Sequence, residues 1–174
     1  MAYWLMKSEP HAFSIDDLKQ VRTNSWDGVR NYQARNMMRD DMRKGDLAFF
    51  YHSSCKEPGI VGVMTIAREA YPDEIEFGRK GKRIKGNPDP ENPTWFMVDV
   101  RYRRKLKRNI TLQELKSQKE LEDLTLLRRG NRLSIMPVSK SRCTALRIAD
   151  GASSSTKTAC AAVMIDSQIP LIWA

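Results

Sequence analysis

The segment of residues 25–36 constrains the fold of this chain more than any other stretch, because it places a large aromatic residue, a turn and a helix start close together. Asp27-Gly28 indicates a turn, since glycine tolerates positive φ and aspartate bonds to its own backbone. Trp26 should therefore lie where the chain bends. There it either fills the core or forms the wall of a cavity, and the residue alone leaves both readings open.

The same segment leads into a predicted amphipathic helix that ends at Lys44-Gly45. Apolar and basic residues each recur every four positions, on neighbouring faces. The apolar positions are Ala34, Met38 and Met42, and the basic positions are Arg35, Arg39 and Arg43. We expect the apolar face to pack on the core and the N-terminus near Asn31 to offer unpaired N–H groups beside Trp26.

Strand patterns and helix starts alternate irregularly along the rest of the chain, which predicts an α+β protein with a mainly antiparallel, barrel-like sheet. Strands are expected at residues 3–8, 47–52, 60–67, 95–102 and 133–138, with Pro137 limiting the last one to an edge or a strand end. Helices are expected after Ser14 and after Thr111, where Asp17 and Glu114 would complete capping boxes, and over 121–129. Residues 74–93 read as a long surface loop. We expect one domain over residues 1–141, followed by a Ser/Ala-rich, poorly ordered tail over 142–174.

Positive charge is concentrated in two runs, residues 79–85 and 101–108, in a chain of net charge +9 and pI near 9.6. Such runs attract polyanions, so nucleic acid is the first partner to consider, although a merely solvated basic surface gives the same pattern. No apolar run approaches the ~20 residues of a membrane span, and no secretion signal is recognised. We expect no membrane partner and a cytoplasmic protein, or a nuclear one in a eukaryote.

Catalytic and metal-binding patterns are missing from the sequence. His11 and His52 are the only histidines, and the three cysteines lack the paired spacing of a zinc site or a disulfide framework. There is no phosphate-cradling glycine loop and no G-x-S-x-G elbow. We therefore expect no metal, no cofactor and no enzymatic activity, with His52 serving as a hydrogen-bonding residue.

Aromatic residues near turns and strand ends offer a different chemistry. They are Trp4, Trp26, Trp95, Tyr32, Tyr51 and Tyr102. Such rings can hold a flipped or single-stranded base by stacking while polar groups read its edge.

Several long motifs, in order along residues 2–140, closely resemble the EVE-domain family. These motifs are residues 3–10, 26–36, 49–53, 57–62, 69–73, 93–100 and 132–135. The resemblance implies a PUA-like fold, a small β-barrel flanked by helices. It also implies a nucleic-acid-binding module whose pocket takes a modified base, in particular a modified cytosine.

Site residues follow from the resemblance by matching motif. The base pocket would comprise Ser8, Trp26, Asn31, Tyr51, His52, Ser53, Trp95, Arg132, Leu133 and Ser134. Lys7, Arg30 and Arg35 would bind phosphates. Two regions depart from the family pattern: the basic, Gly-rich residues 77–88 and the end of the chain after Ser141.

The leading hypothesis is a non-catalytic module that holds a modified base, with 5-substituted cytosine as the expected ligand, in DNA or RNA. The alternative is an RNA-modifying or RNA-processing enzyme or its accessory subunit, which the basic runs also suit. A third reading is a protein-interaction module whose positive charge keeps it in solution. The choice between DNA and RNA stays open, because no motif indicates contacts to the 2′-hydroxyl. The oligomeric state stays open as well.

Overall fold

The computed structural model of the protein describes residues 1–73 and 91–149, so the loop expected at 74–93 lies mostly outside the described residues. The strands are β1 (Tyr3–Ser8), β2 (Thr23–Trp26), β3 (Leu47–His52), β4 (Gly59–Pro72), β5 (Phe96–Thr111) and β6 (Ile135–Val138). The helices are α1 (Ile15–Val21), α2 (Tyr32–Asn36), α3 (Leu112–Ser117) and α4 (Lys140–Ala149). Shorter turns are the π-helical η1 (Met37–Asp41) and the 3-10 turns η3 (Lys119–Leu121) and η4 (Thr125–Leu127).

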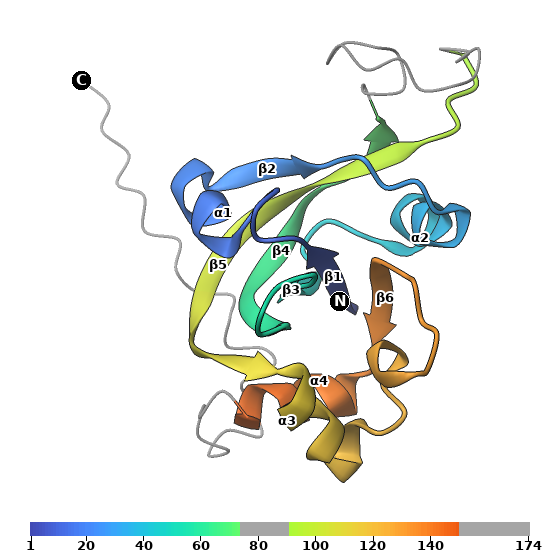
Figure 1. Ribbon diagram of the computed structural model, residues 1–174. Coiled ribbons are helices and arrows are strands. Elements are labelled where there is room, and N and C mark those ends of the chain that lie inside the picture. Colours follow the sequence, from blue (N-terminus) through green and yellow to red (C-terminus); the bar gives the residue numbers. More distant parts are fainter. Residues whose placement is uncertain (74–90, 150–174) are drawn as a thin grey trace.

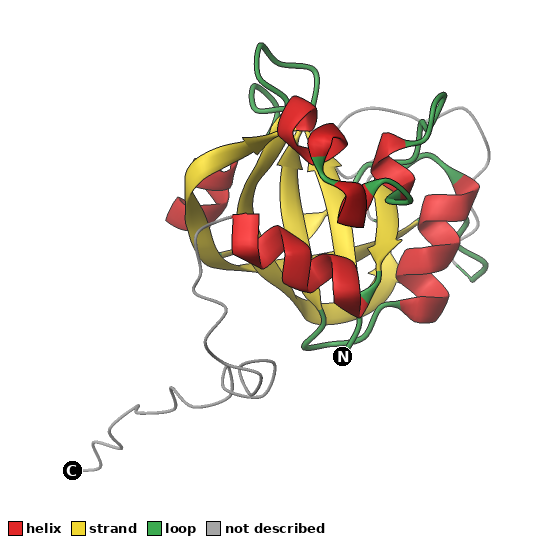
Figure 2. Cartoon of the chain, turned by 90° about the horizontal axis from the view of Figure 1, so that it is seen from below, coloured by secondary structure: helices red, strands yellow, loops and turns green. Residues whose placement is uncertain are grey.

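The six strands form one sheet in the order β2-β5-β4-β3-β1-β6. Only the pairing of β1 with β3 is parallel. The two longest strands, β4 and β5, run side by side across the molecule (Figure 1), and the sheet curls strongly around them (Figure 2). The predicted α+β class with a mainly antiparallel sheet is confirmed. Among the described residues β2 and β6 are unpaired edges, so the barrel is open.

Each face of the sheet carries its own hydrophobic core, because side chains alternate along every strand. In β1, Trp4 and Met6 belong to one core, while Tyr3 and Leu5 belong to the other. The first core receives α1, α2 and η1, and the second receives α3, η3, η4 and α4. The α1 and α2 side of the sheet is the one that carries Trp26.

Helix starts follow the sequence signals closely on the first face. Ser14 and Asp17 form the expected capping box at α1, with each side chain accepting the other residue's backbone N–H, at 3.1 and 2.8 Å. The predicted helix after Asn31 is α2 followed by one π turn, and its apolar positions are fully buried. The helical residues end at Asp41, three residues before the predicted end at Lys44-Gly45, because Met42 is already extended. Gly45, with φ +93°, lies in the turn that leads to β3.

Two expectations on the second face need correction. The helix expected over residues 121–129 is replaced by η3 and η4, whose hydrogen bonds close over three residues because Leu121, Leu124 and Leu126 are all drawn into the core. At α3, Thr111 caps the helix as expected, but Glu114 pairs with Arg108 at 2.6 Å instead of returning the capping bond.

The C-terminal part of the described chain is helical across the predicted domain boundary. The boundary expected between residues 141 and 142 falls inside α4, which buries Cys143 and Leu146 in the second core. This helix therefore packs as part of the domain. Residues 150–174 of the predicted tail lie outside the described residues.

Candidate nucleic-acid interface

A cavity of about 400 Å³ opens at the surface where the end of β1, the end of β2 and the segment before β6 meet. It is lined by Lys7, Ser8, Ala12, Phe13, Asn24, Ser25, Trp26, Asp27, Gly28, Val29, Arg30 and Ser134. Of the predicted base-pocket residues, the structure thus brings Ser8, Trp26 and Ser134 together. The predicted phosphate ligands Lys7 and Arg30 join them.

Trp26 is both a core residue and a wall of this cavity. Its side chain is only 7% exposed, and it packs edge-on against Phe13 and Phe50, with ring centroids 6.5 and 5.3 Å apart. Such edge-to-face pairs fix a ring beyond what its buried area contributes. The indole is therefore held rigidly where it borders the cavity.

Some of the polar groups on the β1 side of the cavity already form hydrogen bonds within the protein. The Ser8 hydroxyl donates to the Phe13 carbonyl at 2.8 Å, so toward a ligand its oxygen acts as an acceptor. The Lys7 backbone N–H donates to the Ser134 carbonyl at 2.8 Å, which joins β1 to the segment before β6. Burial lowers the pKa of the Lys7 amine, whose side chain borders the cavity.

The turn after β2 is held by a buried carboxylate. Asp73, at the end of β4, is fully buried and accepts the Gly28 N–H at 3.0 Å and Arg30 Nη1 at 2.7 Å. Gly28 has φ +72°, a conformation that glycine adopts without strain. Because Asp73 also donates its backbone N–H to the Trp95 carbonyl at 2.9 Å, the turn, β4 and the start of β5 share one anchor.

Trp95 does not line the cavity, although the resemblance assigned it to the base pocket. Its ring lies 4.9 Å from that of Tyr32, with a tilt of 32° between the planes. The Arg30 guanidinium lies 5.4 Å from the Trp95 ring, and the Arg35 guanidinium lies 5.0 Å from the Tyr32 ring. Trp95, Tyr32 and the two arginines therefore form a separate aromatic and cationic cluster.

Two other predicted pocket residues lie on the opposite face of the sheet. Tyr51 is buried in the second core, where burial raises the pKa of its phenol to about 12, and Leu133 packs against the same core. Neighbours along a strand point to opposite faces, so Tyr51 points away from Phe50 and from the Trp26 side.

The remaining predicted residues have other places. Asn31 caps α2, with its side-chain oxygen accepting the Ala34 N–H at 3.0 Å, and it does not line the cavity. Ser53 donates its N–H to the Ser8 carbonyl at 2.9 Å, and Arg132 is exposed. His52 accepts the Ile15 N–H on Nε2 at 3.2 Å, and burial lowers the pKa of its imidazole.

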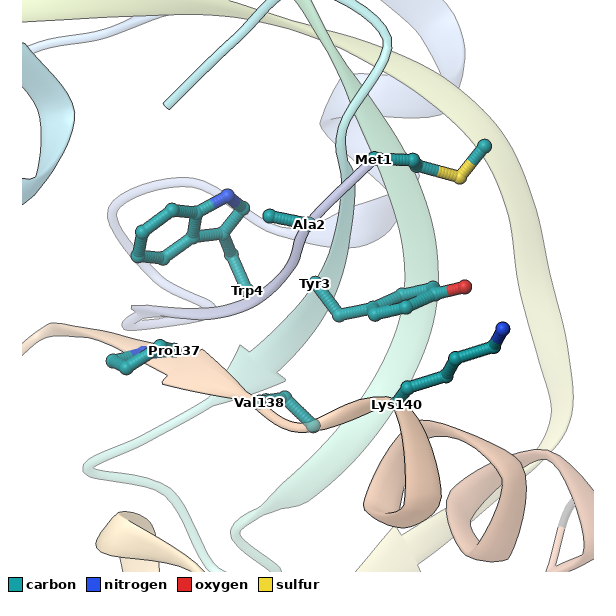
Figure 3. A pocket seen from close by; sticks show the side chains of 7 residues that line it. All are labelled: Met1, Ala2, Tyr3, Trp4, Pro137, Val138 and Lys140. Carbon is teal, nitrogen blue, oxygen red and sulfur yellow. The ribbon is translucent and has the colours of Figure 1, made fainter. Parts of the chain in front are cut away.

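A second cavity, of about 510 Å³, lies between the start of β1 and the end of β6 (Figure 3). Tyr3 and Lys140 extend in the same direction along it, while Trp4 points to the other side of β1. The indole N–H of Trp4 donates to the buried Asp46 at 3.1 Å, which gives this tryptophan a structural contact. None of the predicted site residues lines this second cavity.

The described residues contain no helix with the length and apolar character needed to cross a bilayer. Within the same part of the chain, no three His, Cys, Asp or Glu side chains gather as metal ligands would.

A family model described as the EVE domain matches residues 2–147 of the chain. The chain belongs to the EVE-domain family. Human thymocyte nuclear protein 1 is 46% identical over 158 residues, covering 80% of this chain and 69% of the human protein. The PUA-like fold expected from the resemblance is confirmed by the solved structures of this family.

Two crystal structures of EVE-domain relatives superpose closely on this chain. One is the human THYN1 protein in complex with 5-methylcytosine-containing DNA, with a TM-score of 0.80, 42% identity, and coverage of 88% of this chain and 99% of that one. The other is a Pseudomonas syringae protein, with a TM-score of 0.81, 44% identity, and coverage of 86% and 99%.

Asp73→Asn tests whether the buried carboxylate anchors the site. The substitution keeps the shape but removes the charge that Arg30 requires, so the free energy of unfolding should fall by about 1–3 kcal/mol in urea denaturation. Asp41→Asn removes the same charge from an exposed position and should change stability by less than about 0.5 kcal/mol. Equal effects of the two substitutions would contradict an anchoring role for Asp73.

The hydrogen bond from Ile15 to His52 predicts a pH dependence of stability. Because the pKa of His52 is lowered in the folded state, the unfolded chain takes up the proton first. The stability that neutral His52 contributes is thus complete above 6.5, the pKa of histidine in the unfolded chain. It is lost as the pH falls from there through the lower pKa of the folded state. In His52→Gln the fall in unfolding free energy between about pH 7 and 5 should shrink, whereas His11→Gln, at an exposed histidine, should retain it. If the unfolding free energy of His52→Gln falls with pH as steeply as that of the wild-type protein, this account is contradicted.

Proposed function

We propose that the protein is a non-catalytic nucleic-acid-binding module that holds a modified base, in particular a 5-substituted cytosine, in the cavity beside Trp26. The observation that carries the proposal is the close superposition on the human THYN1 protein, which was crystallised with 5-methylcytosine-containing DNA. A chain so similar in sequence and fold is expected to bind a ligand of the same kind.

The geometry of the cavity supports this proposal. Its volume lies within the range of small-ligand sites, and it combines an aromatic wall with a few polar groups. A base flipped out of the stack needs such an arrangement, with rings against its faces or its 5-substituent and hydrogen-bonding groups along its edge. Trp26 and Phe13 would supply the apolar wall, and Ser8, Asn24 and Ser134 the polar edge contacts.

Cationic side chains at the rim suit the phosphates of the same strand. Lys7 and Arg30 line the cavity, and Arg35 lies nearby in the cluster around Trp95. Arginine and lysine side chains in such positions fix the register of a nucleic acid without reading its sequence. We assign the three residues to phosphate contacts, as the family resemblance implies.

The polar groups near the cavity are arranged for binding rather than for bond breaking. The Ser8 hydroxyl donates its proton to the Phe13 carbonyl and not to a side-chain base, so this contact does not activate it as a nucleophile. His52 accepts a backbone N–H with the nitrogen that a general base would use. These contacts support a module that holds the base unchanged.

An RNA-modifying or RNA-processing enzyme, or its accessory subunit, is the second candidate function. The exposed basic residues along β5, from Arg101 to Arg108, are the observation that favours it. Part of this charge is neutralised, since Lys105 pairs with Asp16 at 2.7 Å and Arg108 pairs with Glu114 at 2.6 Å. Turnover of a tRNA or rRNA substrate by the purified chain would favour this alternative.

The names of the vertebrate relatives support a nuclear site of action if the source is a eukaryote.

The test of the main proposal is a titration of labelled DNA and RNA oligonucleotides that differ only at one cytosine, which is either unmodified or 5-methylated. The wild-type protein should bind the 5-methylated DNA more tightly. Trp26→Phe keeps an aromatic ring in the core but reshapes the cavity wall, so the ratio of the two affinities should fall. Lys7→Gln should weaken both complexes alike. It should also reduce the slope of log K against log salt concentration by about 1, because one phosphate contact is lost.

The controls separate a folding defect from a binding defect. Thermal unfolding of each variant shows whether the fold is retained before affinities are compared. If the wild-type protein shows no preference for any 5-substituted cytosine, and Trp26→Phe binds as the wild type does, the proposed function is contradicted.

A further inference from the structure

Among the described residues, Tyr32 is the one aromatic residue whose side chain lies largely in solvent, with 61% of it exposed. It is the first residue of α2, directly after the Asn31 cap. A single exposed ring is common on protein surfaces, but an accessible ring held against a second aromatic residue is the kind of platform on which nucleobases stack. The protein therefore keeps this ring exposed beside the cavity.

The ring of Tyr32 is held in place by its neighbours. It stacks on Trp95 with a centroid distance of 4.9 Å, and the Arg35 guanidinium lies 5.0 Å from the Tyr32 ring and 6.0 Å from the Trp95 ring. Arg35 Nη1 donates to the Thr94 carbonyl at 2.6 Å, which fixes the arginine to the segment before β5. A ligand would thus meet a preformed aromatic surface edged by a positive charge.

This surface and the cavity share one side chain, Arg30. Arg30 lines the cavity, and its guanidinium also lies 5.4 Å from the Trp95 ring. The buried Asp73 holds both sides together, because it binds the Gly28 N–H at the cavity and donates its own N–H to the Trp95 carbonyl. The two sites are therefore adjacent and rigidly connected.

We infer that Tyr32 and Trp95 form a second stacking site, which takes the nucleobase next to the one held in the cavity. This inference rests on the proposed function, since it needs a nucleic-acid strand that places one base beside Trp26. A flipped base leaves its neighbour in the strand without a stacking partner on one face, and an exposed aromatic ring can replace that partner. The guanidinium groups of Arg30 and Arg35 then lie where the phosphate between the two bases would pass.

The test is a double-mutant cycle of binding affinities, in which the Tyr32 ring is removed from the protein and the neighbouring base is removed from the oligonucleotide. The probes are oligonucleotides with one 5-methylcytosine, in which the adjacent nucleotide on one side, then on the other, is replaced by an abasic site. Tyr32→Ala should weaken binding of the intact oligonucleotide by about 5- to 150-fold, the range expected for one stacked base. On the oligonucleotide that lacks the stacked neighbour, the same substitution should have little effect.

Two matched variants serve as controls. Tyr32→Phe retains the ring and should bind nearly as the wild type does. Val21→Ala removes an exposed apolar side chain from α1 and should leave every affinity unchanged. Because Tyr32 is exposed, Tyr32→Ala should unfold at nearly the wild-type temperature, so a loss of affinity reports on the contact.

The outcomes distinguish this inference from the proposed function. If the wild-type protein prefers 5-methylcytosine but Tyr32→Ala binds the intact oligonucleotide as tightly, or loses the same factor on every abasic probe, the second stacking site is overturned while the proposed function stands. If the wild-type protein shows no preference for the modified base, the proposed function fails. A loss of affinity in Tyr32→Ala that depends on the neighbouring base would still support the stacking site.

Discussion

The buried carboxylate of Asp73 is the interaction on which the candidate interface depends. A charge without access to water is tolerated only when it is paired and hydrogen-bonded, so its partners are held firmly. Those partners are the Gly28 N–H and the Arg30 guanidinium, while the backbone N–H of Asp73 binds the Trp95 carbonyl. One residue therefore fixes the turn that shapes the cavity and binds the backbone of Trp95, the cluster residue that directly precedes β5. In this EVE-domain chain the cavity beside Trp26 and the cluster around Trp95 are consequently held by one shared anchor.

Most of the fold could be predicted from the sequence, because its signals act over a few residues. The capping box at Ser14, the four-residue apolar spacing from Ala34 and the Pro137 edge strand all depend on local geometry, and the structure has each of them. At the leucine-rich residues 121–129 the local sequence pattern predicted the wrong element. Their apolar pattern suits a helix, but the tight 3-10 turns arise because the second core draws in leucines at a shorter spacing. The open sheet likewise depends on strand pairings between distant segments.

The candidate site could be predicted only in part, because a motif names residues but not the face on which each side chain lies. Ser8, Trp26 and Ser134 come together around the cavity, whereas Tyr51 belongs to the opposite face through the alternation of β3. The role of Asp73 was missed for a different reason. An aspartate at the end of a strand reads as a surface residue, and its partners at the turn after β2 come close only after β4 and β5 have paired.

The most direct measurement of the central claim is an NMR spectrum of a DNA oligonucleotide whose 5-methylcytosine carries a ¹³C-labelled methyl group. If the base enters the cavity, the methyl resonance should shift on binding through the ring currents of Trp26 and Phe13, and it should show nuclear Overhauser contacts to those rings. The neighbouring base should show contacts to Tyr32. If the DNA binds while its methyl resonance keeps the position it has in the free oligonucleotide, and contacts appear only to basic side chains of β5, the base does not enter the cavity and the account is contradicted.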